Sequence, residues 1–454
     1  MKPARHTGTM YVTRLANHLD QLRPLLGEAF AMSNNVRLAI LVSALGYFVD
    51  VYDLILFSIL RTSSLTDLGL SGDQLVTVGG YLLNMQMFGF LVGGVLWGVI
   101  GDKIGRIELL FGSILLYSVG NILNGFVGQF GPTVDSIISP IDQYAWLRLI
   151  TGIGLAGEIG GGITLVSELL PKKSRGIGTT IVVATGVAGA VVAGAVYELF
   201  SWRMAYIVGG LMGLGLLLLR LSVAESGIFK SLADKEHIAR GNFFMLFTSW
   251  DRFNRYINCI LVGIPIWFSL GIIVTFSPEL APALGITEKV VAGSSVFWFY
   301  CGITTGSVAN GLISQWLQSR KLAIGIFLFA TLASLGVIFH VPLSTASEFY
   351  TIVFVLGFFT AYWAMMVTVA AEQFGTNLRA TVATSVPNFV RGATVLTVML
   401  FEFLRPTTGI VGAAEVVAIL VGVFAIYAFF SLRETFHVDL DYVETDAKPV
   451  RQAS

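Results

Sequence analysis

The chain has 454 residues, of which 55% are hydrophobic and 12% are charged, and its formal net charge is zero. Ordinary soluble domains carry about 25% charged residues, so this composition and a mean hydropathy of +0.78 exclude a water-exposed protein of this size. The balanced charge gives no reason to expect a nucleic-acid partner. The expected surroundings are a lipid bilayer.

Apolar runs follow one another along the whole chain, and each is long enough to cross the hydrocarbon core, which takes roughly 20 residues in a helix. The alternating ten-residue pattern of a membrane β-barrel is not seen. We therefore predict an all-α membrane protein with twelve transmembrane helices. The predicted spans are 37–60, 75–100, 108–128, 144–170, 177–199, 204–223, 256–277, 290–316, 321–341, 349–371, 381–404 and 412–432.

The distribution of Lys and Arg predicts the orientation, because cytoplasmic loops carry an excess of both. Of the 28 basic residues, 22 fall in segments that this reading assigns to the cytoplasm. Four are external (Arg61, Arg203, Lys289 and Arg405), and Arg148 and Arg391 lie within spans. The first apolar run is too long for a signal peptide and is expected to stay as span 1. We predict a multi-pass protein of the cell inner membrane with both termini cytoplasmic.

A long polar connection divides the twelve spans into six and six. The predicted organisation is a cytoplasmic segment 1–36, a six-helix bundle 37–223, a cytoplasmic linker 224–255, a second six-helix bundle 256–432 and a cytoplasmic tail 433–454. The halves repeat, because Glu168 and Arg175 after span 4 have the same separation as Glu372 and Arg379 after span 10. Two such halves with a site at the bilayer midplane are a known transporter architecture.

The loop after span 2 carries Gly98, Asp102, Gly105 and Arg106 at the spacing of a known cytoplasmic signature, G-x-x-x-D-R-x-G-R-R. This pattern resembles the major facilitator superfamily, although Lys103 and Ile107 depart from it. The resemblance implies a major facilitator fold of two six-helix halves. Span 4 is similar to the sugar-porter and metabolite–proton symporter branches, and the paired acids of span 1 resemble the phosphate–proton and aromatic-acid–proton branches.

The signature loop is expected to form a conformational latch on the cytoplasmic face. Asp102 could lie at the positive N-terminal end of a helix, and Arg106 could pair with Glu168. The alternative is an ordinary solvated loop. The residues assigned to the latch are Gly98, Asp102, Gly105, Arg106, Glu168, Arg175, Glu372 and Arg379.

An ionisable residue deep within a span costs at least about 2.5–3.5 kcal/mol on insertion scales, and five such residues are the strongest functional candidates. They are Asp50, Asp53, Arg148, Glu158 and Arg391. The sugar-porter resemblance implies that Asp53 and Arg148 form a proton-coupling pair; a static structural ion pair is the alternative. Asp50, one turn from Asp53, could be a second proton site or a substrate contact. Glu158 could relay protons with Asp50, or could bond to a backbone or hydroxyl partner.

Arg391 is expected to bind an anion, because no acidic residue lies within one turn of it and an unpaired buried guanidinium is costly. The anion could be the carboxylate of a solute or an internal partner such as Asp50 or Glu158. Asn388 lies one turn before it. Aromatic residues could line the same cavity, or could face lipid instead: Tyr47, Tyr52, Trp267, Trp298, Tyr300 and Trp363.

These features predict a proton-coupled symporter that carries a small organic anion or related metabolite by alternating access. The alternatives are a proton-driven efflux antiporter for drugs, siderophores or metabolites, and a sugar–proton symporter. None of the five histidines lies in the middle of a span, and no nucleophile stands with a base, so we expect no metal, no cofactor and no catalytic residue. The expected partners are a small-molecule substrate and protons, and the chain is expected to be a monomer.

Overall fold

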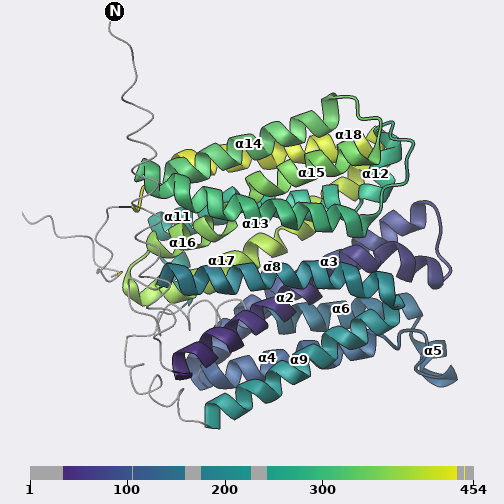
Figure 1. Ribbon diagram of the computed structural model, residues 1–454, viewed down its shortest axis with the longest axis horizontal. Helices are drawn as coiled ribbons and strands as arrows, with labels where there is room; N and C mark the ends of the chain where they lie inside the picture. Colours follow the sequence, from purple (N-terminus) through teal and green to yellow (C-terminus); the bar gives the residue numbers. More distant parts are fainter. Residues whose placement is uncertain (1–33, 105, 159–174, 226–242, 437–443, 445–454) are drawn as a thin grey trace, which may run out of the picture.

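The computed structural model describes residues 34–104, 106–158, 175–225, 243–436 and 444. Every regular element within these residues is helical. Figure 1 shows the helices lying side by side in two groups, with the N-terminal helices in purple to teal below and the C-terminal helices in green to yellow above. The prediction of an all-α membrane protein is confirmed.

The N-terminal half corresponds to predicted spans 1–6. Its helices are α2 (Asn34–Asp67), α3 (Asp73–Ile104), α4 (Arg106–Asn124), the short α5 (Pro132–Ile137), α6 (Pro140–Ala156), α8 (Arg175–Leu199) and α9 (Trp202–Glu225). Helix α6 begins where the sequence favours it, because the Ser139 side chain accepts a hydrogen bond from the Asp142 N–H and Pro140 follows the cap. Helix α2 continues past the predicted end of span 1, so Arg61 lies on the helix and not in an external loop.

The C-terminal half contains more broken helices than the sequence predicts. Its elements are η1 (Phe243–Phe247), α11 (Trp250–Phe268), the π-helix η2 (Ser269–Val274), α12 (Ser277–Ala283), α13 (Ala292–Leu317), α14 (Arg320–His340), α15 (Ala346–Thr360), α16 (Trp363–Glu372), α17 (Thr376–Gly392) and α18 (Thr394–Ser431). Predicted span 10 is divided between α15 and α16, and span 11 is interrupted at Ala393. Gly409, with a φ of 74° that glycine adopts without strain, separates the span 11 part of α18 from span 12.

Eight helical segments in the described part of the chain are long and apolar enough to cross a membrane. Segments 109–124 and 188–199 are shorter apolar helices. Residues 159–174, which complete predicted span 4, lie outside the described residues, as do residues 226–242 of the predicted linker. Helix α11 begins at Trp250, inside the predicted linker 224–255.

Each half contains the same close crossing between two of its own helices. In the N-terminal half, a side chain at Gly152 of α6 would meet the backbone of Gln86 on α3. In the C-terminal half, a side chain at Gly302 of α13 would meet the backbone of Phe354 on α15. Small residues allow such backbone contact in membrane helices. Because α3 and α6 are spans 2 and 4, and α13 and α15 belong to spans 8 and 10, the same crossing occurs at corresponding places in the repeat.

The halves meet along a few helices that bring the predicted site residues together. Helix α17 packs against α3, and α13 packs against α8 and α2. Gly94 of α3 faces the side chain of Asn388 on α17. Residues of the first and second halves therefore share one interface at the level of Asn388 and Arg391.

Candidate functional site

Arg391 lies on α17 inside a cluster of aromatic rings and is 2% exposed. The guanidinium carbon is 4.9 Å from the ring centre of Phe90, 5.1 Å from Trp267 and 5.9 Å from Trp363. Phe90 belongs to α3 of the first half, whereas Trp267 on α11 and Trp363 on α16 belong to the second. Aromatic faces stabilise a cation in a site with little water, so the rings explain part of how this charge is tolerated.

Asp50 on α2 provides the nearest negative charge to Arg391. Its Oδ2 lies 3.8 Å from Nη2 of Arg391, and the carboxylate is fully buried. Neither oxygen of Asp50 has a hydrogen-bond partner among the described residues, and neither do Nε and Nη1 of Arg391. The ion pair therefore joins the two halves but leaves most of the hydrogen-bonding capacity of both groups unused.

Two tyrosines lie near this pair, and Asn388 lies one turn before Arg391 on α17. Tyr47 of α2 and Tyr300 of α13 both interact electrostatically with Arg391 and Asp50. Asn388 donates from Nδ2 to the backbone oxygen of Ala156, at 3.0 Å, and to that of Thr384, at 3.2 Å. The first of these hydrogen bonds crosses from the second half to the first. Asn388 therefore helps to hold α17 against the end of α6.

Asp53 and Arg148 are both fully buried within the N-terminal half. They interact electrostatically, and the Asn121 side chain approaches Asp53, but no hydrogen bond joins Asp53 to Arg148 within the described residues. The Arg148 guanidinium lies over the rings of Phe57, at 5.1 Å, and Tyr206, at 5.6 Å. The sequence predicts that Asp53 and Arg148 lie at the same depth in the membrane. The structure places them near each other, but no direct ion pair or hydrogen bond joins them within the described residues.

Glu158 has a partner that sequence reasoning did not identify. Arg220 of α9 donates from Nη1 to Oε2 of Glu158, at 3.1 Å, and from Nη2 to Oε1. Both side chains are buried. Arg220 lies near the predicted end of span 6 and was assigned to the cytoplasmic charges. Its neighbours Leu216 to Leu219 and Leu221 are apolar, and this run was the only sequence signal that the residue could be buried.

The aromatic residues predicted to line the cavity do not all lie at one site in the structure. Trp267 and Trp363 face Arg391 and are in contact with each other, with ring centres 5.9 Å apart. The hydroxyl of Tyr52 donates to the Ala205 backbone oxygen at 2.9 Å within the N-terminal half. Trp298 is 42% exposed on the surface of the helix bundle, where its ring packs against Phe354. Phe90, in contrast, contacts Arg391 and was not among the predicted site residues.

Only part of the predicted cytoplasmic latch can be compared with the structure. Gly105 and Glu168 lie outside the described residues, and so do the side chains of Asp102, Arg106 and Arg175. Gly98 lies on α3, and Arg379 lies near the start of α17. In the second half, Arg320 at the start of α14 forms an ion pair with Glu372 at the end of α16. This pair stands where the repeat places a counterpart of Arg106 and Glu168.

Comparisons with known proteins place the whole arrangement in context. Residues 38–396 match the Major Facilitator Superfamily. The 3-(3-hydroxy-phenyl)propionate transporter of Escherichia coli is 24% identical over 78% of this chain and 85% of its own. The gentisate transporter of Corynebacterium glutamicum is 24% identical over 76% of this chain and 75% of its own. A D-xylose-proton symporter structure, 15% identical, covers 89% of this chain and 99% of its own with a TM-score of 0.60, which is a likeness of fold.

Proposed function

This chain belongs to the Major Facilitator Superfamily and is a membrane transporter for small molecules, not an enzyme, and from that premise we propose that it is a proton-coupled symporter of a small organic anion. We propose further that the anion is a carboxylate with an aromatic ring. The observation that carries the proposal is the buried Arg391, which stands between three aromatic rings and one loosely held carboxylate.

The guanidinium of Arg391 supplies the anion contact. A planar guanidinium binds a carboxylate through two parallel N–H donors. Nε and Nη1 have no partner among the described side chains and backbone, and each can form such a parallel pair with Nη2, which faces Asp50. At 3.8 Å, Asp50 is too distant for a strong hydrogen bond and holds Arg391 only by charge. A solute carboxylate that reached Arg391 would therefore gain contacts that Asp50 does not make.

The rings around Arg391 favour a flat solute. Trp267 and Trp363 meet edge to face and Phe90 approaches from the other half, so a ring entering between them would find aromatic surfaces from both halves. Offset or edge-to-face ring pairs contribute about 0.5–1.5 kcal/mol beyond the area they bury. The two relatives from Escherichia coli and Corynebacterium glutamicum are named for solutes of this chemical class, which supports the proposal.

Proton coupling is assigned to the acids of α2. Asp50 and Asp53 are both fully buried, and buried acids within membrane spans mark proton pathways in transporters. Binding of an anion at Arg391 would add a negative charge beside Asp50, and a proton on that acid would remove the repulsion. Asp53 would likewise take up a proton when Arg148 moves away from it, because its negative charge would then lose the nearby positive charge.

The test is uptake into liposomes that contain the purified protein, under an imposed inward proton gradient. Gentisate and 3-(3-hydroxyphenyl)propionate are compared with cyclohexanecarboxylate, which keeps the charge without the aromatic ring, and with xylose. Protein-free liposomes and an Arg391→Ala variant correct for weak acids that cross the bilayer unaided. We expect accumulation of the aromatic carboxylates above both controls.

The outcome also separates the alternative functions. Accumulation of xylose in place of the acids would favour the sugar–proton symporter. Outward movement of the acid, driven by protons that flow inward, would favour the efflux antiporter. Equal uptake by the wild type and the Arg391→Ala variant would remove Arg391 from the solute site.

A further inference from the structure

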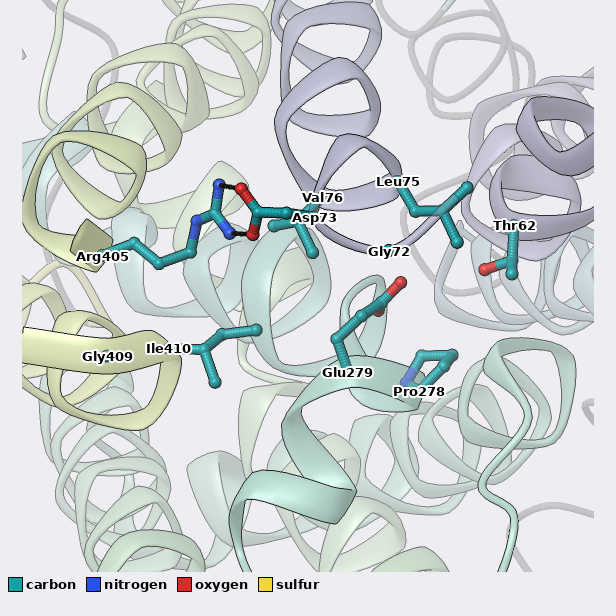
Figure 2. Close-up of a pocket in the computed structure, with 10 residues that line it drawn as sticks. All are labelled: Thr62, Gly72, Asp73, Leu75, Val76, Pro278, Glu279, Arg405, Gly409 and Ile410. Atoms are coloured by element: carbon teal, nitrogen blue, oxygen red, sulfur yellow. Dashed lines mark hydrogen bonds and ion pairs between the residues drawn. The ribbon is translucent and has the colours of Figure 1, made fainter. Parts of the chain in front are cut away.

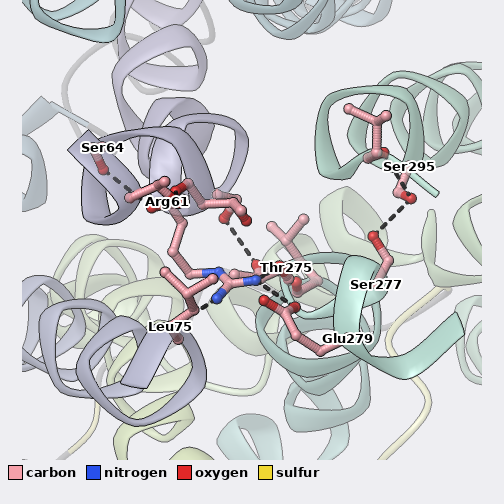
Figure 3. A network of polar contacts seen from close by, with 12 residues as sticks. Arg61, Ser64, Leu75, Thr275, Ser277, Glu279 and Ser295 are labelled. Atoms are coloured by element: carbon pink, nitrogen blue, oxygen red, sulfur yellow. Dashed lines mark hydrogen bonds and ion pairs between the residues drawn. The ribbon is translucent and has the colours of Figure 1, made fainter. Parts of the chain in front are cut away.

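The end of the bundle where α2 finishes and α3 begins is closed by Arg61. This residue is fully buried although the sequence assigned it to a loop. Nη1 donates to the Leu75 backbone oxygen at 2.8 Å, and Nη2 donates to Oε2 of Glu279 at 2.6 Å and to the Thr275 backbone oxygen at 3.2 Å. Figure 3 shows the guanidinium reaching between these groups. Leu75 belongs to the first half and the other two acceptors to the second, so Arg61 joins the halves.

Two neighbouring contacts strengthen this junction. Oγ1 of Thr275 lies 2.9 Å from Oγ of Ser58, one turn before Arg61 on α2. The Arg61 guanidinium also lies 4.6 Å from the ring centre of Phe276. The segment from Thr275 to Glu279 therefore meets α2 through a charge, a hydroxyl pair and an aromatic face.

A second ion pair near Arg61 also joins the two halves, but here the arginine belongs to the second half and the acid to the first. Arg405 of α18 pairs with Asp73 at the start of α3, and its Nη2 donates to Oγ1 of Thr77 at 2.8 Å. In Figure 2 this pair lies beside a surface pocket that Glu279 also lines. Arg405 also donates to Glu402 of its own helix at 3.1 Å. Each half thus supplies one arginine that is bonded to its own half and reaches across to the other.

The helices that form this junction also carry the proposed site. Helix α2 holds Asp50 and Asp53 as well as Arg61. Trp267 lies near the end of α11, and the π-helix η2 connects that helix to Thr275. A π-helical turn often marks a functional segment. Parting of the halves at Arg61 would therefore open a route toward Arg391 along α2 and η2.

We propose that Arg61 and Glu279 form a gate at this end of the transport path, which closes over the site and must break and re-form in every cycle. Arg61 keeps its bond to Leu75 when the gate opens and loses Glu279 and Thr275. The pair of Arg405 and Asp73 is the weaker element, because Asp73 is 77% exposed and exposed pairs contribute little. The proposal rests on membership of the transporter family and not on the identity of the solute.

The experiment measures access to a cysteine placed behind the gate. In a Ser58→Cys reporter, the thiol replaces the hydroxyl that contacts Thr275, in a residue that is 5% exposed. Its labelling rate with a polar maleimide is measured in detergent micelles, where both faces of the protein meet the reagent. Glu279→Ala should raise the rate at least tenfold, whereas Asp73→Ala should raise it less than threefold.

Glu415→Ala is the matched control. Glu415 of α18 lies 3.2 Å from His340 of α14, so this pair joins two helices of the same half. Its loss should leave the labelling rate within twofold of the reporter alone. Equal rates in the Glu279→Ala and Glu415→Ala reporters would overturn the proposal. No solute is needed, so the result is independent of whether the liposome experiment succeeds.

A second variant keeps Arg61 and Glu279 intact, in case Glu279→Ala does not fold. Cysteines at both Ser58 and Thr275 would stand close enough to cross-link on oxidation, and the bond would hold the gate shut. We expect transport of the solute identified in liposomes to stop on oxidation and to return on reduction, with no effect in either single-cysteine variant. Full transport with the cross-link formed would refute the gate.

Discussion

Arg220 of α9 and Glu158, two residues past the end of α6, form a buried ion pair in which two guanidinium nitrogens donate to the two carboxylate oxygens. The pair lies within the N-terminal half and links α9 to the residues just after α6. Two-point pairing satisfies both charged groups at once. Glu158 therefore has a structural role available to it in addition to the proton relay that the sequence predicts.

A double-mutant cycle separates the two roles. Glu158→Leu alone should lower thermal stability in detergent strongly, since removing one partner of a buried pair costs about 3–5 kcal/mol. The double variant Glu158→Leu with Arg220→Met should regain most of that loss, because no uncompensated charge remains. If the double variant is stable and still couples uptake to the proton gradient, Glu158 acts as a structural partner. Stability with lost coupling would support the relay.

Arg391→Lys tests whether the solute is held by a planar guanidinium. Lysine keeps the charge but lacks the fork that binds a carboxylate at two points. Loss of one charged hydrogen bond, about 1.5–3 kcal/mol, should raise the KM for the aromatic anion by roughly 10- to 100-fold. Initial rates over a range of anion concentrations measure this, with Arg405→Lys as a control. A KM unchanged from the wild type would place the anion elsewhere.

Asp53→Asn and Asp50→Asn test the assignment of proton coupling to α2. Each variant should lose accumulation driven by a pH gradient, because an amide cannot carry the proton. Exchange of labelled for unlabelled solute at equal pH should remain, since it needs no net proton movement. Asp67→Asn is the control on the same helix, because Asp67 is 54% exposed and pairs loosely with Arg203 at 3.5 Å. An Asp53→Asn protein that concentrates solute like the wild type would disprove the role of Asp53.

Two glycines of α13 allow a matched test of the repeated helix crossing. A methyl group at Gly302 would meet the backbone of Phe354 and Phe358, whereas nothing lies within 4 Å of one at Gly311. Gly302→Ala should therefore destabilise the protein by about 1–3 kcal/mol through overpacking. Gly311→Ala should be neutral or stabilising by up to about 1 kcal/mol, because alanine favours the helix. Melting temperatures of the two variants provide the comparison, and equal values would contradict the crossing.

Glu434 gives a pH-dependent prediction at the start of α14. Partial burial opposes ionisation there, but hydrogen bonds from Ser319 and from the backbone N–H groups of Phe436 and Arg320 outweigh it and lower the pKa of Glu434 below its ordinary value of 4.5. A carboxylate with a lowered pKa stabilises the fold above its ordinary pKa, and this stabilisation is lost as the pH falls toward the lower, folded value. At neutral pH, Glu434→Gln should therefore lower the free energy of unfolding by about 1 kcal/mol, which is measured as a lower melting temperature. The gap should close as the pH falls below about 4.5. A gap that does not change with pH would argue against this cap.

The apolar runs along the sequence correctly predicted which charged residues deep in the spans are buried. The five ionisable residues that the sequence singled out deep within spans are all buried: Asp50, Asp53, Arg148, Glu158 and Arg391. Helix ends were predicted less well, because Arg61 and Arg220 lie where an apolar run meets polar sequence and were counted as loop charges. A charge at such a boundary can be buried when a partner from another helix reaches it, and no pattern within the run reports that partner.

The sequence by itself determined the solvent, the helical fold class and the repeat, because lipid excludes charge from each span separately and every span shows this in its own residues. The tertiary structure alone decided the partners: Asp50 for Arg391, Arg220 for Glu158, and Glu279 for Arg61. Each pair joins helices that are far apart in the chain, and two of the three join the two halves. Coulomb attraction depends on distance in space, which only the packed arrangement of the helices fixes.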